Sequence, residues 1–156
     1  MAAPWKVRGL QLEDKSAKAI QKILACKLHE MMSYRIRVLN SEPEGVHAMR
    51  VSARRLQTML KLSKKFLPRK KLETFSESVK ELIVDLGEVR DRDVFISNLH
   101  SSLDRTHQTI PPSAQKILNL YESQRKRAFR HLRSTLLRLE KKHFAEKFSA
   151  FLEKTL

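Results

Sequence analysis

The sequence has few of the residues that break helices or cross-link a chain. Its 156 residues include 3 glycines, 5 prolines and a single cysteine, Cys26. One cysteine excludes an intramolecular disulfide, and because the N-terminus lacks a long apolar segment we expect the chain in a reducing cytoplasm. No apolar run approaches the roughly 20 residues that a membrane-spanning helix needs, so we expect no insertion into a bilayer.

Acidic and aromatic residues are also scarce. Lys and Arg number 32 against 17 Asp and Glu, which gives a formal net charge of +15. This excess indicates a partner that is rich in phosphate or another anionic group. Aromatic residues make up only 6% of the chain, so few side chains could stack on the bases of single-stranded nucleic acid.

The low glycine and proline content, without alternating β-branched or aromatic runs, predicts an all-α fold. We expect an N-terminal tail over residues 1–13 and a single helical domain over residues 14–156. Four long helices would form a bundle, with a short additional C-terminal helix. The expected helices cover residues 14–40, a segment ending at Leu67-Pro68, and residues 69–103, 113–142 and 145–154. Gly87, inside the third of these, permits a kink or a close helix crossing.

The most informative segment lies between Glu44 and Glu73, where nine basic residues occur without any acidic residue. At about 100° per residue, one arc of the second helix collects the following polar side chains: His47, Arg50, Arg54, Gln57, Lys61, Lys64 and Lys65. We call this set the cationic face. A solvated helix surface is the alternative, but such surfaces usually alternate Glu with Lys because these pairs support the helix. The absence of acids here favours a binding surface.

Two motifs carry a family resemblance. They are His47-x-x-Arg50-Val51-x-x-Arg54-Arg55-Leu56 and Leu86-Gly87-Glu88-Val89-Arg90-Asp91-Arg92-Asp93-Val94. In this order and spacing they resemble the CHAD domain, the conserved histidine α-helical domain, over about residues 14–140. The resemblance implies an all-helical bundle that binds inorganic polyphosphate through a basic groove.

The family usually has two similar four-helix halves, and this chain resembles one half. A truncated fragment, a short family member and a half that pairs with another copy are all compatible with this. The last helix carries Phe144, Phe148, Phe151 and Leu152 on one stripe, which either packs within the monomer or forms a homodimer interface.

The resemblance assigns phosphate binding to His47, Arg50 and Arg54. The planar guanidinium of arginine offers a fork of donors that suits phosphate oxygens. Further basic residues could extend the site or remain solvated. These are Lys61, Lys64 and Lys65 on the cationic face, Lys18 and Lys22 on the first helix, and Arg130 and Arg133 on the fourth.

Arg55 falls in the apolar arc of its helix, where a buried guanidinium needs a carboxylate. We expect Asp91 or Asp93 to form a structural ion pair with it. These two carboxylates point about 160° apart on a helix, so we expect no metal site there.

The sequence therefore predicts a non-catalytic protein that binds inorganic polyphosphate without a cofactor and that could associate with polyphosphate granules. Cys26 is expected to be a small core residue, and no glycine-rich phosphate loop is present. Two alternatives remain: binding of RNA or another nucleic-acid backbone, and a regulatory accessory module that docks on an enzyme of phosphate metabolism.

Overall fold

The computed structural model describes residues 3–106 and 109–155, and these residues contain helices and no strand. The predicted all-α bundle is thereby confirmed. The helices are α1 (Ser16–Ser33), α2 (Arg35–Leu39), α3 (Pro43–Leu62), the 3₁₀ helix η1 (Ser63–Lys65), α4 (Arg69–Thr106), α5 (Pro112–Lys141) and α6 (Phe144–Thr155). None of the helices in the described ranges is long and apolar enough to cross a membrane.

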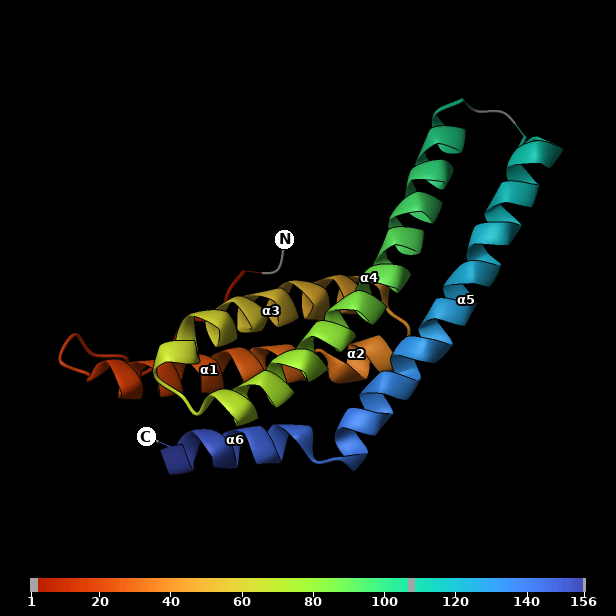
Figure 1. Cartoon of the computed structure of the whole chain (residues 1–156). Helices are drawn as coiled ribbons and strands as arrows, with labels where there is room; N and C mark the ends of the chain where they lie inside the picture. The colour runs from red at the N-terminus through yellow and green to blue at the C-terminus, as the bar shows by residue number, and fades with distance from the viewer. Residues whose placement is uncertain (1–2, 107–108, 156) are drawn as a thin grey trace.

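The helices are arranged around α3 and α4. α1 packs along one side of α3, α4 crosses its other side, and α5 packs against α4, while α6 returns beneath the bundle to contact α1 (Figure 1). The last turns of α4 and the first turns of α5 extend beyond the other helices as a two-helix arm (Figure 1). Phe95 and Tyr121 stack within this arm, with ring centroids 3.7 Å apart.

Three helices differ from their predicted bounds, and one of them is α3, which ends at Leu62 and is followed by η1 before the predicted end at Leu67-Pro68. The expected helix over residues 14–40 is divided at Tyr34 into α1 and α2. The Ser33 hydroxyl donates to the Glu30 carbonyl over 2.7 Å, and this type of bond competes with regular helical bonding and bends helices. α4 continues through Gly87 to Thr106, three residues beyond the predicted end of this helix at residue 103.

The apolar stripe of α6 is buried within the monomer. Phe148 is 0% exposed, and Phe144, Phe151 and Leu152 are also buried. The ring of Phe75 from α4 stacks on Phe148 with the centroids 4.7 Å apart. Of the two alternatives left open for the stripe, packing within the monomer therefore holds, and these four residues do not form a homodimer interface.

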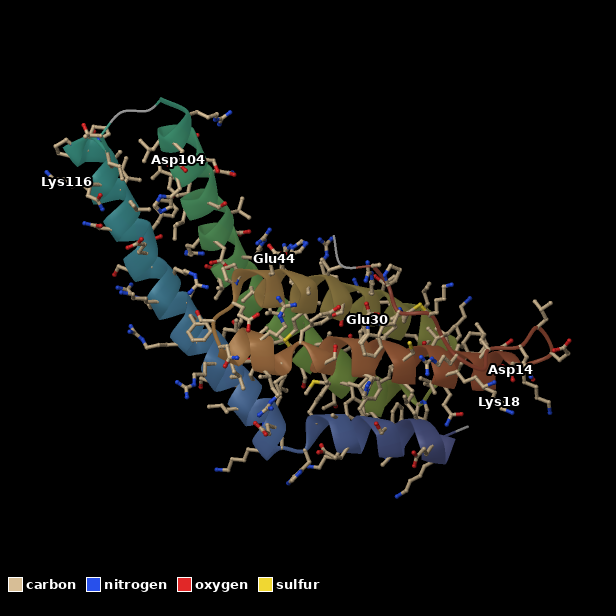
Figure 2. All side chains as sticks on the ribbon, turned by 180° about the vertical axis from the view of Figure 1, so that it is seen from behind. Asp14, Lys18, Glu30, Glu44, Asp104 and Lys116 are labelled. Carbon is tan, nitrogen blue, oxygen red and sulfur yellow. The ribbon has the colours of Figure 1, made fainter. Side chains whose placement is uncertain are left out.

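The predicted pairing of Arg55 is also wrong. Nη1 of Arg55 donates to Oε1 of Glu30 over 2.9 Å, and Lys27 bonds the other oxygen of Glu30 over the same distance. Glu30 is 0% exposed in the middle of the bundle (Figure 2). Asp91 is exposed on α4, and Asp93 pairs with another arginine. The reason is that α1, not the second half of α4, lies against this part of α3.

Asp93 instead holds the turn between α2 and α3 through Arg125 of α5. Arg125 donates from Nε to Asp93, from Nη1 to the Ser41 hydroxyl over 2.8 Å and from Nη2 to the Ser41 carbonyl over 3.1 Å. Ser41 has a left-handed backbone with φ of 61°. Close packing follows the turn, because a Cβ on Gly45 would lie 2.7 Å from Cβ of Arg37. This contact network fixes where α3 begins.

The tail before α1 packs on the bundle without forming a helix. The Trp5 and His29 rings lie 5.3 Å apart, and Lys27 donates to the Trp5 carbonyl over 3.1 Å. Cys26 is only half-buried and lies near Lys6 of this segment. The described part of the predicted tail therefore covers one side of α1.

Candidate functional site

A groove of about 560 Å³ lies between α3 and α4. Arg54, Lys61 and Lys64 of the cationic face line it from the α3 side, and Lys80 faces them from α4. Nε2 of Gln57 donates to the hydroxyl of Ser76 over 2.9 Å, which joins the two helices across the groove. The amphipathic pattern of α3 produces this placement, since Ala53, Leu56 and Leu60 are buried on its opposite side.

His47 and Arg50 lie on the same face of α3, nearer to its start. Nδ1 of His47 and Nε of Arg50 are buried, and neither has a hydrogen-bond partner among the described residues. Nε of Arg50 lies 3.5 Å from the point where a Cβ on Gly87 would stand. This is an ordinary van der Waals distance, so Gly87 lies beside Arg50 on the side of α4 that faces α3, but the packing there would admit a Cβ, and the kink or close crossing expected from the sequence stays a prediction.

The pKa of His47 is lowered from its usual value near 6.5. Burial of the ring is the main cause, and the positive charge of Arg90 on α4 adds to it, while Glu44 partly opposes the shift. A nearby cation and loss of solvent both disfavour the protonated imidazole. An anion bound beside His47 would have the opposite effect.

The cations of the groove are not neutralised within the described structure. Arg54, Lys61, Lys64 and Lys80 are exposed and form no ion pair there. Two acids do line the groove, Glu73 and Glu77. The first is engaged by Nε of Arg69 over 2.8 Å, and this contact lowers the pKa of Glu73. The groove thus presents a positive surface with a geometry open to solvent.

The remaining predicted residues do not line this groove. Lys18 and Lys22 lie on α1, where both pair with Asp14 at 4.0 and 2.6 Å, at the end of the bundle far from the arm (Figure 2). Arg130 and Arg133 are exposed on α5. No described residue of α1 or α5 contributes to the groove. Lys18, Lys22, Arg130 and Arg133, which the sequence left open as groove residues or solvated residues, thus lie outside this groove, because α1 packs against α3 on a different side from α4 and α5 lies beyond α4.

Lys65, at the end of η1, is exposed but does not line the groove either.

Sequence reasoning missed the contribution of α4 to the groove. Lys80 lines the groove, and Gly87 and Arg90 continue the same side of α4 towards Arg50 and His47. Ser76, Lys80, Ile83, Gly87 and Arg90 recur at intervals of three or four residues, so their spacing alone indicates one helix face.

A family model described as the CHAD domain matches residues 22–156. The chain belongs to the CHAD family. The match includes both motifs and the whole of the groove, whereas Lys18 and most of the N-terminal segment precede it. No curated protein and no solved structure gave a significant match.

In this CHAD domain the first motif supplies His47, Arg50 and Arg54, and the second supplies Gly87 and Arg90 from the helix opposite. The two motifs therefore meet between α3 and α4. Within the described ranges no group of three or more His, Cys, Asp or Glu residues is arranged to hold a metal ion. The chemistry that this arrangement offers is electrostatic attraction and hydrogen-bond donation to an anion.

Proposed function

We propose that this protein binds inorganic polyphosphate, without catalysing a reaction on it, in the groove between α3 and α4. The observation that carries the proposal is the placement of unpaired cations on both walls of one groove in a CHAD domain. The CHAD family is associated with polyphosphate binding. Arg54, Lys61 and Lys64 would contact the polymer from α3 and Lys80 from α4.

The geometry of the groove suits a flexible chain of phosphates. Arg54 would donate a pair of hydrogen bonds to phosphate oxygens, while the lysines act as point charges along the track. From Arg54 to Lys61 the helix rises by about 10 Å, so several phosphates could be engaged at once. Binding would release condensed counterions and weaken as salt is added.

His47 and Arg50 lie on the same face of α3 as Arg54 and support an extension of the site towards the start of α3. Their side chains are half-buried, so a phosphate would reach them through their accessible atoms. Arg90 lies near enough to His47 to lower its pKa, so the same phosphate would be attracted by three side chains. We expect one end of the bound segment to lie here.

Competition binding tests the proposal. Labelled polyphosphate should bind at near-physiological salt, and affinity should fall steeply as salt rises severalfold. Unlabelled polyphosphate should compete much more strongly than RNA, duplex DNA or heparin at equal phosphate or sulfate content. Equal competition by all four polymers would refute selective polyphosphate binding, and preferential competition by RNA would favour the nucleic-acid alternative.

A further inference from the structure

α5 carries a second concentration of positive charge that lies outside the groove. No acidic residue occurs between Glu122 and Glu140. Lys126, Arg130 and Arg133 are exposed in this interval and form no ion pair with any described residue. Leu137, an exposed apolar residue, occupies the next position on this side of α5, and Lys141 follows it one turn later. We call Lys126, Arg130, Arg133 and Lys141 the α5 strip.

The α5 strip points away from the bundle. Leu132, Leu136 and Leu139 are buried and face the core. Arg130 lies about 160° around the helix from Leu132, which places its side chain opposite the core. From Lys126 to Lys141 the helix rises by about 22 Å. The strip is therefore a linear series of cations on a rigid support, about twice as long as the rise from Arg54 to Lys61 in the groove.

α4 separates the α5 strip from the groove. Asp85 of α4 faces α5, where its carboxylate lies 3.3 Å from Nε2 of His131. Gly87, two residues later, faces α3 through Arg50. Residues two apart on a helix point about 160° apart, so the two neighbours of α4 lie on nearly opposite sides of it. A short anion in the groove would leave the strip free.

We propose that the α5 strip is a second binding site for polyphosphate and that each protein molecule can hold two segments of the polymer. This inference rests on the proposed function, because it assigns a second segment of the same polymer to the strip. The chemistry favours a bare phosphate chain over single-stranded nucleic acid. Tyr121 is engaged by Phe95 and Phe129 packs against the core, so the strip offers no free ring for base stacking.

Two binding sites on one rigid protein would allow polyphosphate to cross-link protein molecules, which a single site would not. A long polymer that reaches sites on several molecules would cross-link them, because binding at one site raises the local concentration of polymer at other sites. Short chains that fill one site at a time would bind without cross-linking. Chain length would therefore decide between soluble complexes and large assemblies.

The experiment compares the unmodified protein with Arg130→Glu/Arg133→Glu. The control Lys147→Glu/Lys154→Glu makes the same change in net charge at exposed positions of α6. Calorimetry with short polyphosphate gives the stoichiometry, light scattering with long polyphosphate gives cross-linking, and circular dichroism checks the fold. In the strip variant we expect the stoichiometry to fall by roughly half and scattering to fall at least about tenfold. The control should resemble the unmodified protein.

The outcomes separate the two proposals. Unchanged stoichiometry and scattering in Arg130→Glu/Arg133→Glu would overturn the second site and leave the groove proposal intact. Absence of any binding by the unmodified protein would overturn both. A strip variant that loses duplex RNA binding but keeps its full capacity for polyphosphate would assign the strip to nucleic acid and overturn the inference.

Discussion

The two sides of α4 differ in whether their charged residues are paired. On the side that faces α5, acids meet bases across the helix interface: Asp93 pairs with Arg125, Glu81 with Arg138, and Asp85 lies beside His131. On the side that faces α3, Lys80 lies opposite Arg54 and Lys61 of the groove. One helix therefore carries both an interface held by opposite charges and a groove in which four cations without ion pairs, Arg54, Lys61, Lys64 and Lys80, outnumber two acids, Glu73 and Glu77.

This difference indicates what each set of charges does. Asp93 and Asp85 are buried, and a buried carboxylate needs a partner to offset its lost hydration. The groove cations are exposed, so water screens their mutual repulsion and its cost is small. The fold can retain them without partners, and they remain available to an anion. Paired charges should thus control stability, and unpaired charges should control binding.

The largest expected effect on stability comes from the paired side. Asp93→Ala removes the carboxylate that Arg125 bonds while that guanidinium stays mostly buried. Removal of one partner of a buried pair typically costs about 3 kcal/mol or more, and the turn at Ser41 should loosen with it. Urea denaturation measures the loss, and polyphosphate affinity should change little. Normal stability combined with lost binding would place Asp93 in the binding site instead.

On the side of α4 that faces α3, where the groove cations are unpaired, the largest expected effect is on the affinity for polyphosphate. Arg54→Glu with Lys61→Glu reverses two charges that line the groove and should weaken polyphosphate binding about 100-fold, which corresponds to about 2.7 kcal/mol. Helical circular dichroism should remain because both side chains are exposed. Lys70→Glu with Lys71→Glu, at exposed positions that do not line the groove, makes the same charge change as a control. Equal loss in both variants would show that only net charge matters.

Helical periodicity predicted the groove wall on α3 because it depends on one helix alone. The same rule placed Phe144, Phe148, Phe151 and Leu152 on one stripe and Arg55 among apolar neighbours. Periodicity left open what covers the stripe, and the predicted partner of Arg55 was wrong. Phe75 covers the stripe and Glu30 pairs with Arg55. The partner depends on which helices meet, and periodicity carries no information on that.

Helical periodicity also could not predict that α4 forms one wall of the groove or that Lys22 is paired with an acid. The spacing of Ser76, Lys80, Ile83 and Gly87 marks a face but not the helix that it meets. Lys22 shares a face with Lys18, yet Asp14 engages both, and its contact with Lys22 lowers the pKa of Asp14. A sequence pattern identifies cations on one face, whereas the fold decides which of them are neutralised.

A smaller effect is expected from pH, on which the affinity for polyphosphate should depend. Because the pKa of His47 is lowered by burial and by Arg90, a bound phosphate should raise it and proton uptake should accompany binding. Affinity should therefore increase as pH falls between the His47 pKa of the bound protein and the lower pKa of the free protein, by less than about tenfold per pH unit because at most one proton is taken up. Binding at constant ionic strength measures this slope, and His47→Gln should flatten it.

The same shift has the opposite sign for the stability of the unliganded protein. Between the lowered folded pKa of His47 and its usual value near 6.5, the unfolded chain binds more protons than the folded one. Stability contributed by neutral His47 is therefore present above about pH 6.5 and is lost as pH falls through the folded pKa. Urea denaturation at several pH values checks this. Affinity that falls together with stability would contradict a phosphate contact at His47.

The smallest effect should be a gain of affinity from Glu77→Gln. Glu77 is an exposed acid that lines the groove and has no ion pair among the described residues. Its charge opposes the approach of a phosphate, although water screens that repulsion strongly. Removing the charge should strengthen polyphosphate binding about twofold, and the gain should shrink as salt rises. Glu153→Gln, at an exposed position on α6, removes the same charge far from the groove and should leave affinity unchanged. If both variants gained equally, the groove would have no more influence on the polymer than the rest of the surface, and the contrast between the two sides of α4 would carry no functional meaning.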